Sequence, residues 1–167
     1  IWYSPQSGIW QTVWLESTPV DYIQNVRITP DFDSQTVKFE TQNHLTVQKL
    51  IYDGDNLIAD TIDDVVKIDN AKEWSPENPF LYDVIFKYKD DEVHSYFGIR
   101  KFSVGKDGNG MSRLMLNNKP YFMNGLLDQG YYPDGFLTPP SNEAMEFDVK
   151  SVKNLGFNML RKHIKIE

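Results

Sequence analysis

The chain contains no cysteine among its 167 residues. Disulfides and thiolate metal sites are therefore excluded, whereas the redox compartment stays open because secreted proteins need not carry disulfides. No apolar stretch approaches the roughly 20 residues of a membrane-spanning helix. The first residues hold neither an initiator methionine nor a signal peptide. We therefore expect no membrane span, and the sequence does not indicate a cell compartment.

Basic residues are also scarce. The chain has 17 Lys and Arg against 24 Asp and Glu, a formal net charge of −7, so a phosphate backbone would find little to neutralise it and no nucleic-acid partner is expected. His44 and His94 are isolated from partners at ligand spacing, which predicts no metal site. No phosphate loop or Gly-rich dinucleotide motif indicates a cofactor. A homo-oligomer remains open.

Apolar residues are plentiful. Hydrophobic residues make up 40% and aromatic residues 14% of the chain, enough for a packed core and too many for a disordered segment. The chain begins at Ile1 without an initiator and stops at Glu167 directly after an apolar segment. Both ends lead us to expect a piece of a longer protein.

Residues 21–104 predict one short strand after another. In the segment Phe80–Tyr88, every second residue from Phe80 onward is apolar, and Asp83 and Lys87 fall on the other face, which predicts one buried and one exposed face. Asp90-Asp91 is expected to close a hairpin with a long strand at Val93–Val104. Further strands are expected at Ile9–Glu16, Tyr22–Thr29, Gln35–Thr41, Leu45–Tyr52, Leu57–Thr61 and Val65–Ile68. About seven short strands with regular turn signals predict a mainly β fold, an immunoglobulin-like sandwich.

The pattern changes after Val104. Asn117-Asn118 between two apolar runs predicts a hairpin turn. After a loop over residues 125–140, Ser141 or Asn142 can cap a helix that Gly156 ends, with an apolar stripe of Met145, Val149 and Val152. A strand follows at 157–164. Strand, loop, helix and strand predict a βαβ unit of a parallel α/β fold.

Four segments carry a resemblance to a known family, in the order of that family. Residues 7–16 resemble the last strand of the sugar-binding jelly roll of glycoside hydrolase family 2, the family of β-galactosidases. Residues 78–82 with 97–102 resemble the final hairpin of its immunoglobulin-like middle domain. Residues 116–125 resemble the entry into its (β/α)₈ barrel, and residues 156–161 resemble the second barrel strand.

The resemblance implies three parts and a reaction. Residues 1–18 would end the jelly roll, 19–104 would form the sandwich, and 105–167 would begin the catalytic barrel. The family cleaves β-glycosides with retention by two glutamates that lie about 5 Å apart. In the family both lie on later barrel strands, and no acidic residue here sits in a matching motif, so we expect no catalytic residue in this chain.

The resemblance also indicates substrate-binding residues. Arg161 follows a barrel-strand motif, and a matching Arg of the family lies in the floor of the sugar pocket, where a guanidinium keeps the nucleophilic carboxylate ionised. His163 comes two residues later, where the family's common gap is three, so a substrate role and ordinary packing stay open. Lys162 and Lys165 could join Arg161 to hold a carboxylated sugar or could simply flank the strand.

The loop after the first expected barrel strand provides three further candidates. Asp128, Gln129 and Tyr131 stand where better-known members carry histidines close to the sugar. Their side chains can hydrogen-bond sugar hydroxyls, and an ordinary polar loop is an equal alternative. Trp10 and Trp14 share one face of the expected first strand, which favours packing between domains over sugar stacking.

The sequence thus predicts a non-catalytic fragment of an exo-acting β-glycosidase, with a carbohydrate as the partner of the whole enzyme. A β-galactoside is the expected substrate, and a β-glucuronide or β-mannoside is the alternative. The sandwich would act as a spacer between the other two domains. A stand-alone carbohydrate-binding or adhesion module remains the second hypothesis.

Overall fold

The computed structural model describes residues 4–9 and 11–163 of the chain. Its backbone divides into two compact units, one of residues 17–121 and the other of residues 1–16 together with 122–167. The boundaries that the sequence suggested were 18–19 and 104–105. The expectations for Trp10, Lys165 and the end of the last strand fall on residues that lie outside the described part of the chain.

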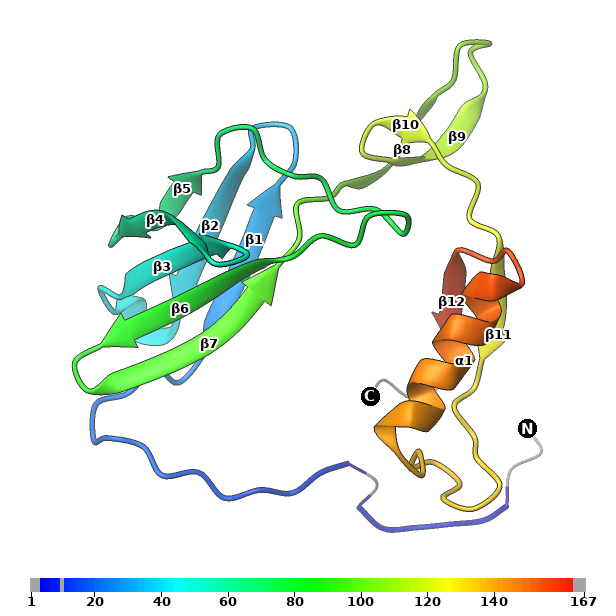
Figure 1. Ribbon diagram of the computed structural model, residues 1–167, viewed down its shortest axis with the longest axis horizontal. Helices are drawn as coiled ribbons and strands as arrows, with labels where there is room; N and C mark the ends of the chain where they lie inside the picture. The colour runs from blue at the N-terminus through cyan, green and yellow to red at the C-terminus, as the bar shows by residue number, and fades with distance from the viewer. Residues whose placement is uncertain (1–3, 10, 164–167) are drawn as a thin grey trace. The chain divides into compact units, whose positions relative to one another are not determined.

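Residues 17–121 contain a two-layered β-sandwich (Figure 1). One sheet has the antiparallel order β1-β2-β5, with β1 at Val26–Asp31, β2 at Thr36–Thr41 and β5 at Val65–Lys67. The other has the antiparallel order β4-β3-β6-β7, with β3 at Gln48–Asp53, β4 at Asn56–Thr61, β6 at Tyr82–Tyr88 and β7 at Asp91–Phe97. A single 3₁₀ turn, Gln42–His44, separates β2 from β3 in this described part. The prediction of a mainly β fold is confirmed.

The alternation in β6 builds the core of the sandwich. Tyr82, Val84 and Phe86 are almost fully buried, as their spacing predicted. From the opposite sheet, the Phe39 ring packs edge-on against Phe86 at 5.6 Å and against Phe97 at 6.0 Å between ring centroids. Burying such a side chain contributes roughly 1.5–3 kcal/mol, so these contacts hold the two sheets together.

The prediction of one long strand at Val93–Val104 is wrong. The chain forms β7, leaves the sheet, and forms β8 at Phe102–Lys106 in a separate sheet with β9 at Ser112–Leu116 and β10 at Lys119–Pro120. A residue distant in sequence contacts the chain at the break, since the Ile99 carbonyl accepts a hydrogen bond from the Trp74 N–H at 2.9 Å. Gly98 lies against the Trp74 ring, where a Cβ would come within 3.2 Å of Cδ1.

The hairpin turn at Asn117-Asn118 is confirmed. Both residues have positive φ, 52° and 63°, the geometry of a two-residue type I′ turn, which asparagine tolerates. Asn117 is also buried, and its Oδ1 accepts the Lys101 N–H at 2.9 Å while its Nδ2 donates to the Trp74 carbonyl at 3.1 Å. The turn predicted at Asp90-Asp91 lies one residue earlier in the structure, at Lys89-Asp90. Asp91 is already the first residue of β7 and pairs with Tyr88 of β6.

Lys49 is buried in the sandwich, which the sequence did not predict. Only 1% of the residue is exposed. Its Nζ donates to the Ile62 carbonyl at 2.9 Å and to Asp64 Oδ1 at 3.1 Å. Lysine is almost never fully buried unless its charge is paired, and periodicity alone could not reveal that pairing.

The predicted order of strand, helix and strand is found within residues 122–163, but the first strand lies at the start of the range 125–140, where the sequence indicated a loop. Strands β11 (Gly125–Asp128) and β12 (Met159–Lys162) pair in parallel, and helix α1 (Asn142–Asn154) connects them. Ser141 caps α1, as its Oγ accepts the Ala144 N–H at 3.2 Å. Gly156, at φ +88°, ends it in a Schellman motif in which the Phe157 N–H reaches the Val152 carbonyl.

The apolar stripe of α1 is not buried. No residue of the helix is buried, and Val149 is 54% exposed. The helix therefore forms from its caps and backbone hydrogen bonds, while its apolar face lacks the packing that amphipathic helices normally gain from a core. In the described part of the chain, no helix has the length and apolar content needed to cross a membrane.

The prediction of a strand at Ile9–Glu16 is wrong. The described residues before Ser17 form no regular structure. Trp14 is 75% exposed and Leu15 is 97% exposed. A lone strand has no partner for its backbone N–H and C=O groups, and its alternation alone cannot stabilise it.

Candidate functional site

The carboxyl ends of β11 and β12 bring four of the predicted site residues into one region. In the parallel register, Leu127 lies opposite Arg161 and Asp128 lies opposite Lys162. His163 follows directly, and its N–H donates to the Asp128 carbonyl at 2.8 Å. Carboxyl ends of parallel strands are where α/β folds gather functional side chains. Asp128, Arg161 and His163 are thus brought to the same end of the strand pair, and Gln129 follows Asp128.

The Asp128 side chain accepts two hydrogen bonds at the carboxyl end of the strand pair. Its Oδ2 accepts from Lys162 Nζ at 3.0 Å, and its Oδ1 accepts the Gly130 N–H at 2.8 Å. Gly130 is buried and has φ +57°, so the chain turns sharply there. Both carboxylate oxygens therefore already hold protein groups, and the structure shows Asp128 fixing the loop and Lys162.

Arg161 does not join the expected basic cluster. Successive side chains of a strand point to opposite faces, and β12 alternates between exposed and half-buried residues, with Arg161 exposed and Lys162 half-buried. Lys162 forms an ion pair with Asp128. The two cations therefore lie on different faces of β12, and Lys165 lies outside the described residues.

His163 is half-buried beside this strand end. Its Nδ1 is fully shielded from solvent and has no hydrogen-bond partner in the described part of the chain. A buried ring nitrogen without a partner costs roughly 1–3 kcal/mol, so a group that pairs with it would stabilise the site.

The loop residues line a cavity of about 530 Å³ beside α1. Its walls include the predicted residues Asp128, Gln129 and Tyr131, whereas Arg161 and His163 are not among them. Tyr131 also packs on Phe136, 5.7 Å between ring centroids, and its hydroxyl accepts the Ser4 N–H at 3.3 Å. Tyr131 therefore has a packing contact in this loop as well as a place in the cavity wall.

Sequence reasoning missed two polar residues of this cavity. Asp148 and Ser151 of α1 line it together with Val152. Ser151 and Val152 lie three and four residues after Asp148, which places the three side chains on one face of the helix. Of these three residues, the sequence indicated only Val152, as part of the apolar stripe. Within residues 4–9 and 11–163, no group of three or more His, Cys, Asp or Glu could hold a metal ion.

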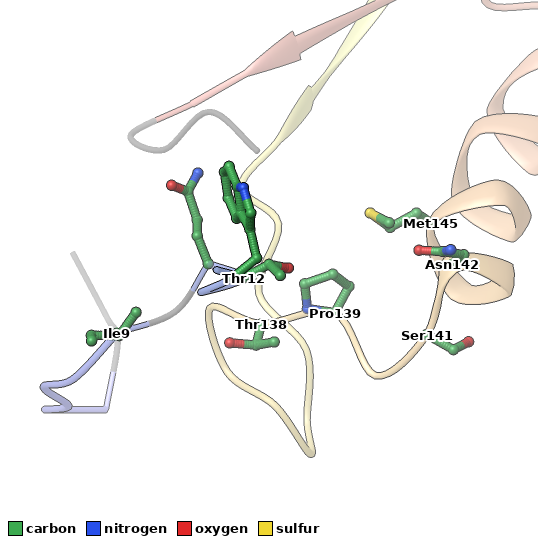
Figure 2. Close-up of a pocket in the computed structure, with 9 residues that line it drawn as sticks. Ile9, Thr12, Thr138, Pro139, Ser141, Asn142 and Met145 are labelled. Atoms are coloured by element: carbon green, nitrogen blue, oxygen red, sulfur yellow. The ribbon is translucent and has the colours of Figure 1, made fainter. Parts of the chain in front are cut away.

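A second cavity, of about 590 Å³, lies in the same unit and was not predicted (Figure 2). The N-terminal segment forms one wall, and the residues that lead into α1 form the other. Asn142 and Met145 project from the first turn of the helix toward the side where Thr12 and Pro139 lie. The complete lining consists of Ile9, Gln11, Thr12, Trp14, Thr138, Pro139, Ser141, Asn142 and Met145.

Comparison with known proteins identifies relatives that cover most of the chain. Residues 41–100 match the family model described as glycosyl hydrolases family 2. A β-galactosidase of Pseudoalteromonas haloplanktis is 26% identical over 93% of this chain, and one of Lactococcus lactis subsp. lactis (strain IL1403) is 27% identical over 93%. The chain spans only 18% and 16% of the lengths of these two enzymes.

Solved structures show the same fold. A β-D-glucuronidase of Dictyoglomus thermophilum superposes with a TM-score of 0.73 at 24% identity, over 89% of this chain and 26% of its own. The β-glucuronidase of Ruminococcus gnavus gives a TM-score of 0.74 at 20% identity, over 88% of this chain and 26% of its own. Identities this low establish the fold and not the substrate.

The resemblance to glycoside hydrolase family 2 is thereby confirmed. The matched residues 41–100 include the middle of the sandwich, which the four sequence motifs had left uncovered, and they overlap the motif at 78–82 with 97–102. The relatives found by sequence extend the match to both units.

Proposed function

Because the chain is related to glycoside hydrolase family 2 in sequence and fold, we propose that it is part of an exo-acting, retaining β-glycosidase and that it contains none of the catalytic glutamates. In this proposal residues 19–104 form the spacer domain, residues 1–18 end a sugar-binding jelly roll, and residues 105–167 begin the catalytic barrel. The observation that carries the proposal is the parallel pairing of β11 and β12, which gathers the candidate sugar-binding residues at one end.

We further propose a β-galactoside as the substrate, with Arg161, His163, Asp128, Gln129 and Tyr131 at the sugar. Two observations support a neutral sugar. The relatives that cover 93% of the chain are β-galactosidases. Lys162, which would suit a sugar carboxylate, is 3.0 Å from the Asp128 carboxylate, so its charge is already compensated.

The gene downstream of Glu167 provides the most direct test. The proposal requires an Asn-Glu pair on a later barrel strand, and a stop codon directly after Glu167 would favour the stand-alone binding module instead. The chain alone should hydrolyse p-nitrophenyl-β-galactoside no faster than buffer. Turnover by the purified chain would show that the catalytic residues lie within it.

The longer protein allows a sharper test of the site. Arg161→Ala should lower kcat/KM for the galactoside by about 100-fold or more, since an electrostatic contact of this kind contributes several kcal/mol to the transition state. Arg113→Ala is the matched control, because Arg113 pairs with Asp107 on an exposed hairpin of the other unit. An equal loss of kcat/KM in both variants would show that Arg161 does not act at the sugar site. A higher kcat/KM for the glucuronide than for the galactoside would overturn the proposed substrate.

A further inference from the structure

The chain contains the dipeptide Asn-Gly twice, at Asn109-Gly110 and at Asn124-Gly125. In water, asparagine loses its side-chain amide most readily before glycine, because the missing Cβ leaves the next backbone nitrogen unhindered and the backbone free to turn. We propose that Asn109-Gly110 is a site of spontaneous deamidation and that the fold protects Asn124-Gly125. This modification needs only water as a co-reactant and is independent of the proposed glycosidase function.

The reaction proceeds through a cyclic imide. The Gly110 nitrogen attacks Asn109 Cγ, so a new N–Cγ bond forms, the Cγ–Nδ2 bond breaks, and ammonia leaves with the proton of the Gly110 N–H. Water then opens the imide at one of its two carbonyls. Opening at the side-chain carbonyl gives an aspartyl residue, and opening at the main-chain carbonyl gives an isoaspartyl residue, in which the main chain runs through the former side chain. Either product carries one new carboxylate.

The loop around Asn109 leaves room for this ring. Residues 107–111 connect β8 and β9 at the tip of a hairpin (Figure 1). Asn109 and Gly110 are both exposed, and a Cβ on Gly110 would meet no atom within 4 Å apart from its chain neighbours. The Gly110 N–H donates to the Asp107 carbonyl at 2.9 Å. Exposed loop tips open at the low end of local unfolding free energies, so this bond is released readily and the nitrogen becomes available.

The second Asn-Gly pair lies at the start of β11, where the backbone of both residues is fixed. The Asn124 N–H donates to Asn158 Oδ1 at 2.8 Å, and the Asn124 carbonyl accepts the Asn158 N–H at 3.0 Å. Gly125 pairs with Met159 of β12, and a Cβ on Gly125 would come within 2.6 Å of Met159 Cε. Turning Asn124 until its Cγ reaches the Gly125 nitrogen would break these bonds and press the new ring against Met159. The strand therefore holds the same dipeptide in an unreactive conformation.

Deamidation at position 109 would alter the loop. Asp107 Oδ1 accepts the N–H groups of Asn109 and Met111, both at 2.9 Å, and Asp107 Oδ2 accepts from Arg113 Nε at 2.9 Å. An isoaspartyl residue lengthens the main chain between the two N–H groups, so Asp107 Oδ1 can no longer accept both. The new carboxylate also adds one negative charge to the formal net charge of −7.

Prolonged incubation of the purified chain at pH 8, followed by tryptic digestion and mass spectrometry, tests the proposal. Cleavage after Lys106 and Arg113 gives a peptide of residues 107–113, which separates Asn109 from Asn124. This peptide should gain one mass unit and resolve into aspartyl and isoaspartyl forms. Position 109 should react at least about tenfold faster than position 124 in the folded chain. In urea, where the pairing of β11 with β12 is lost, the two rates should become similar.

Two glycines of the same loop provide a matched pair of variants. Gly110→Ala places a methyl group beside the attacking nitrogen and should slow the reaction at position 109 at least about tenfold. Gly108→Ala is the control, because a Cβ there would meet no atom within 4 Å apart from its chain neighbours and the attacking nitrogen is unchanged. Gly110 has φ +77°, so alanine also strains the turn. Asn158→Ala is therefore a second, independent variant: it removes an acceptor of the Asn124 N–H and should speed the reaction at position 124.

No mass gain at position 109, equal rates at both positions in the folded chain, or a slow position 124 in urea overturns the proposal. Equal slowing by Gly108→Ala and Gly110→Ala, or an unchanged rate at position 124 in Asn158→Ala, does the same. Hydrolysis of β-glycosides by the longer protein bears on the proposed function alone, so either conclusion can fail while the other stands.

Discussion

The sandwich and the strand–helix–strand unit are stabilised in different ways. In the sandwich, Val37, Ile51, Val84 and Phe86 have no exposed surface. In α1 no residue is buried, although the helix has a Ser N-cap and a Schellman C-cap. Regular secondary structure is thus complete in both regions, but only the sandwich adds a close-packed interior. A change of the same chemical kind should therefore cost far more in the sandwich.

Truncation of an apolar side chain gives the largest expected difference. Phe86→Ala should lower the free energy of unfolding of the sandwich by about 3–5 kcal/mol, because it empties a fully enclosed volume in the core. Val149→Ala, on the half-exposed face of α1, should change stability by less than about 0.5 kcal/mol. Urea unfolding followed by circular dichroism measures both. Equal costs would contradict the contrast between the two regions.

The buried Lys49 provides the next test of the sandwich interior. Asp64→Ala would leave the Lys49 ammonium with only the Ile62 carbonyl, and we expect a loss of about 2 kcal/mol. Lys49→Met should cost less than about 1.5 kcal/mol, because the methionine fills the same space and Asp64, 74% exposed, stays in water. The double variant should be no less stable than Lys49→Met. A smaller loss for Asp64→Ala than for Lys49→Met would show that the pair does not compensate the buried charge.

Removal of the helix cap tests the other region. Ser141→Ala should destabilise α1 by about 1 kcal/mol, because the Ala144 N–H loses its acceptor. Since α1 has no buried residue, the loss should appear as faster amide exchange in the helix, while the unfolding midpoint of the sandwich stays the same. Ser34→Ala, on an exposed turn of the sandwich, is the control. A shifted midpoint in Ser141→Ala would mean that the two regions unfold together.

A pH dependence of the sandwich is the smallest expected effect. The hydrogen bond from Lys101, followed by that from Asn118, holds the pKa of Asp33 below its ordinary value. The ionised carboxylate therefore stabilises the folded state above the unfolded pKa of about 3.9. That contribution is lost as pH falls through the lowered pKa. Asp33→Asn should reduce the difference between the free energies of unfolding at pH 7 and pH 3, measured by urea unfolding. An unchanged difference would show that Asp33 does not contribute to the pH dependence.

Part of the candidate site follows from sequence, and part does not. The motif around Arg161 and the loop at Asp128 could be located through the resemblance to glycoside hydrolase family 2. The ion pair of Asp128 with Lys162 could not be predicted, since it depends on the register of two strands that are 34 residues apart. The separation of Arg161 from Lys162 onto opposite faces depends on the same strand.

Local signals in the sequence determined most of the elements: the alternation in β6, the Asn117-Asn118 turn, the Ser141 cap and the Gly156 stop. These features need only neighbouring residues, because side-chain period, φ preference and capping act within a few positions. Tertiary structure alone decided that the expected long strand breaks at Gly98, that Lys49 is buried, and that Ile9–Glu16 forms no strand. Each depends on whether a distant partner supplies hydrogen bonds, charge or room, which no short stretch of sequence encodes.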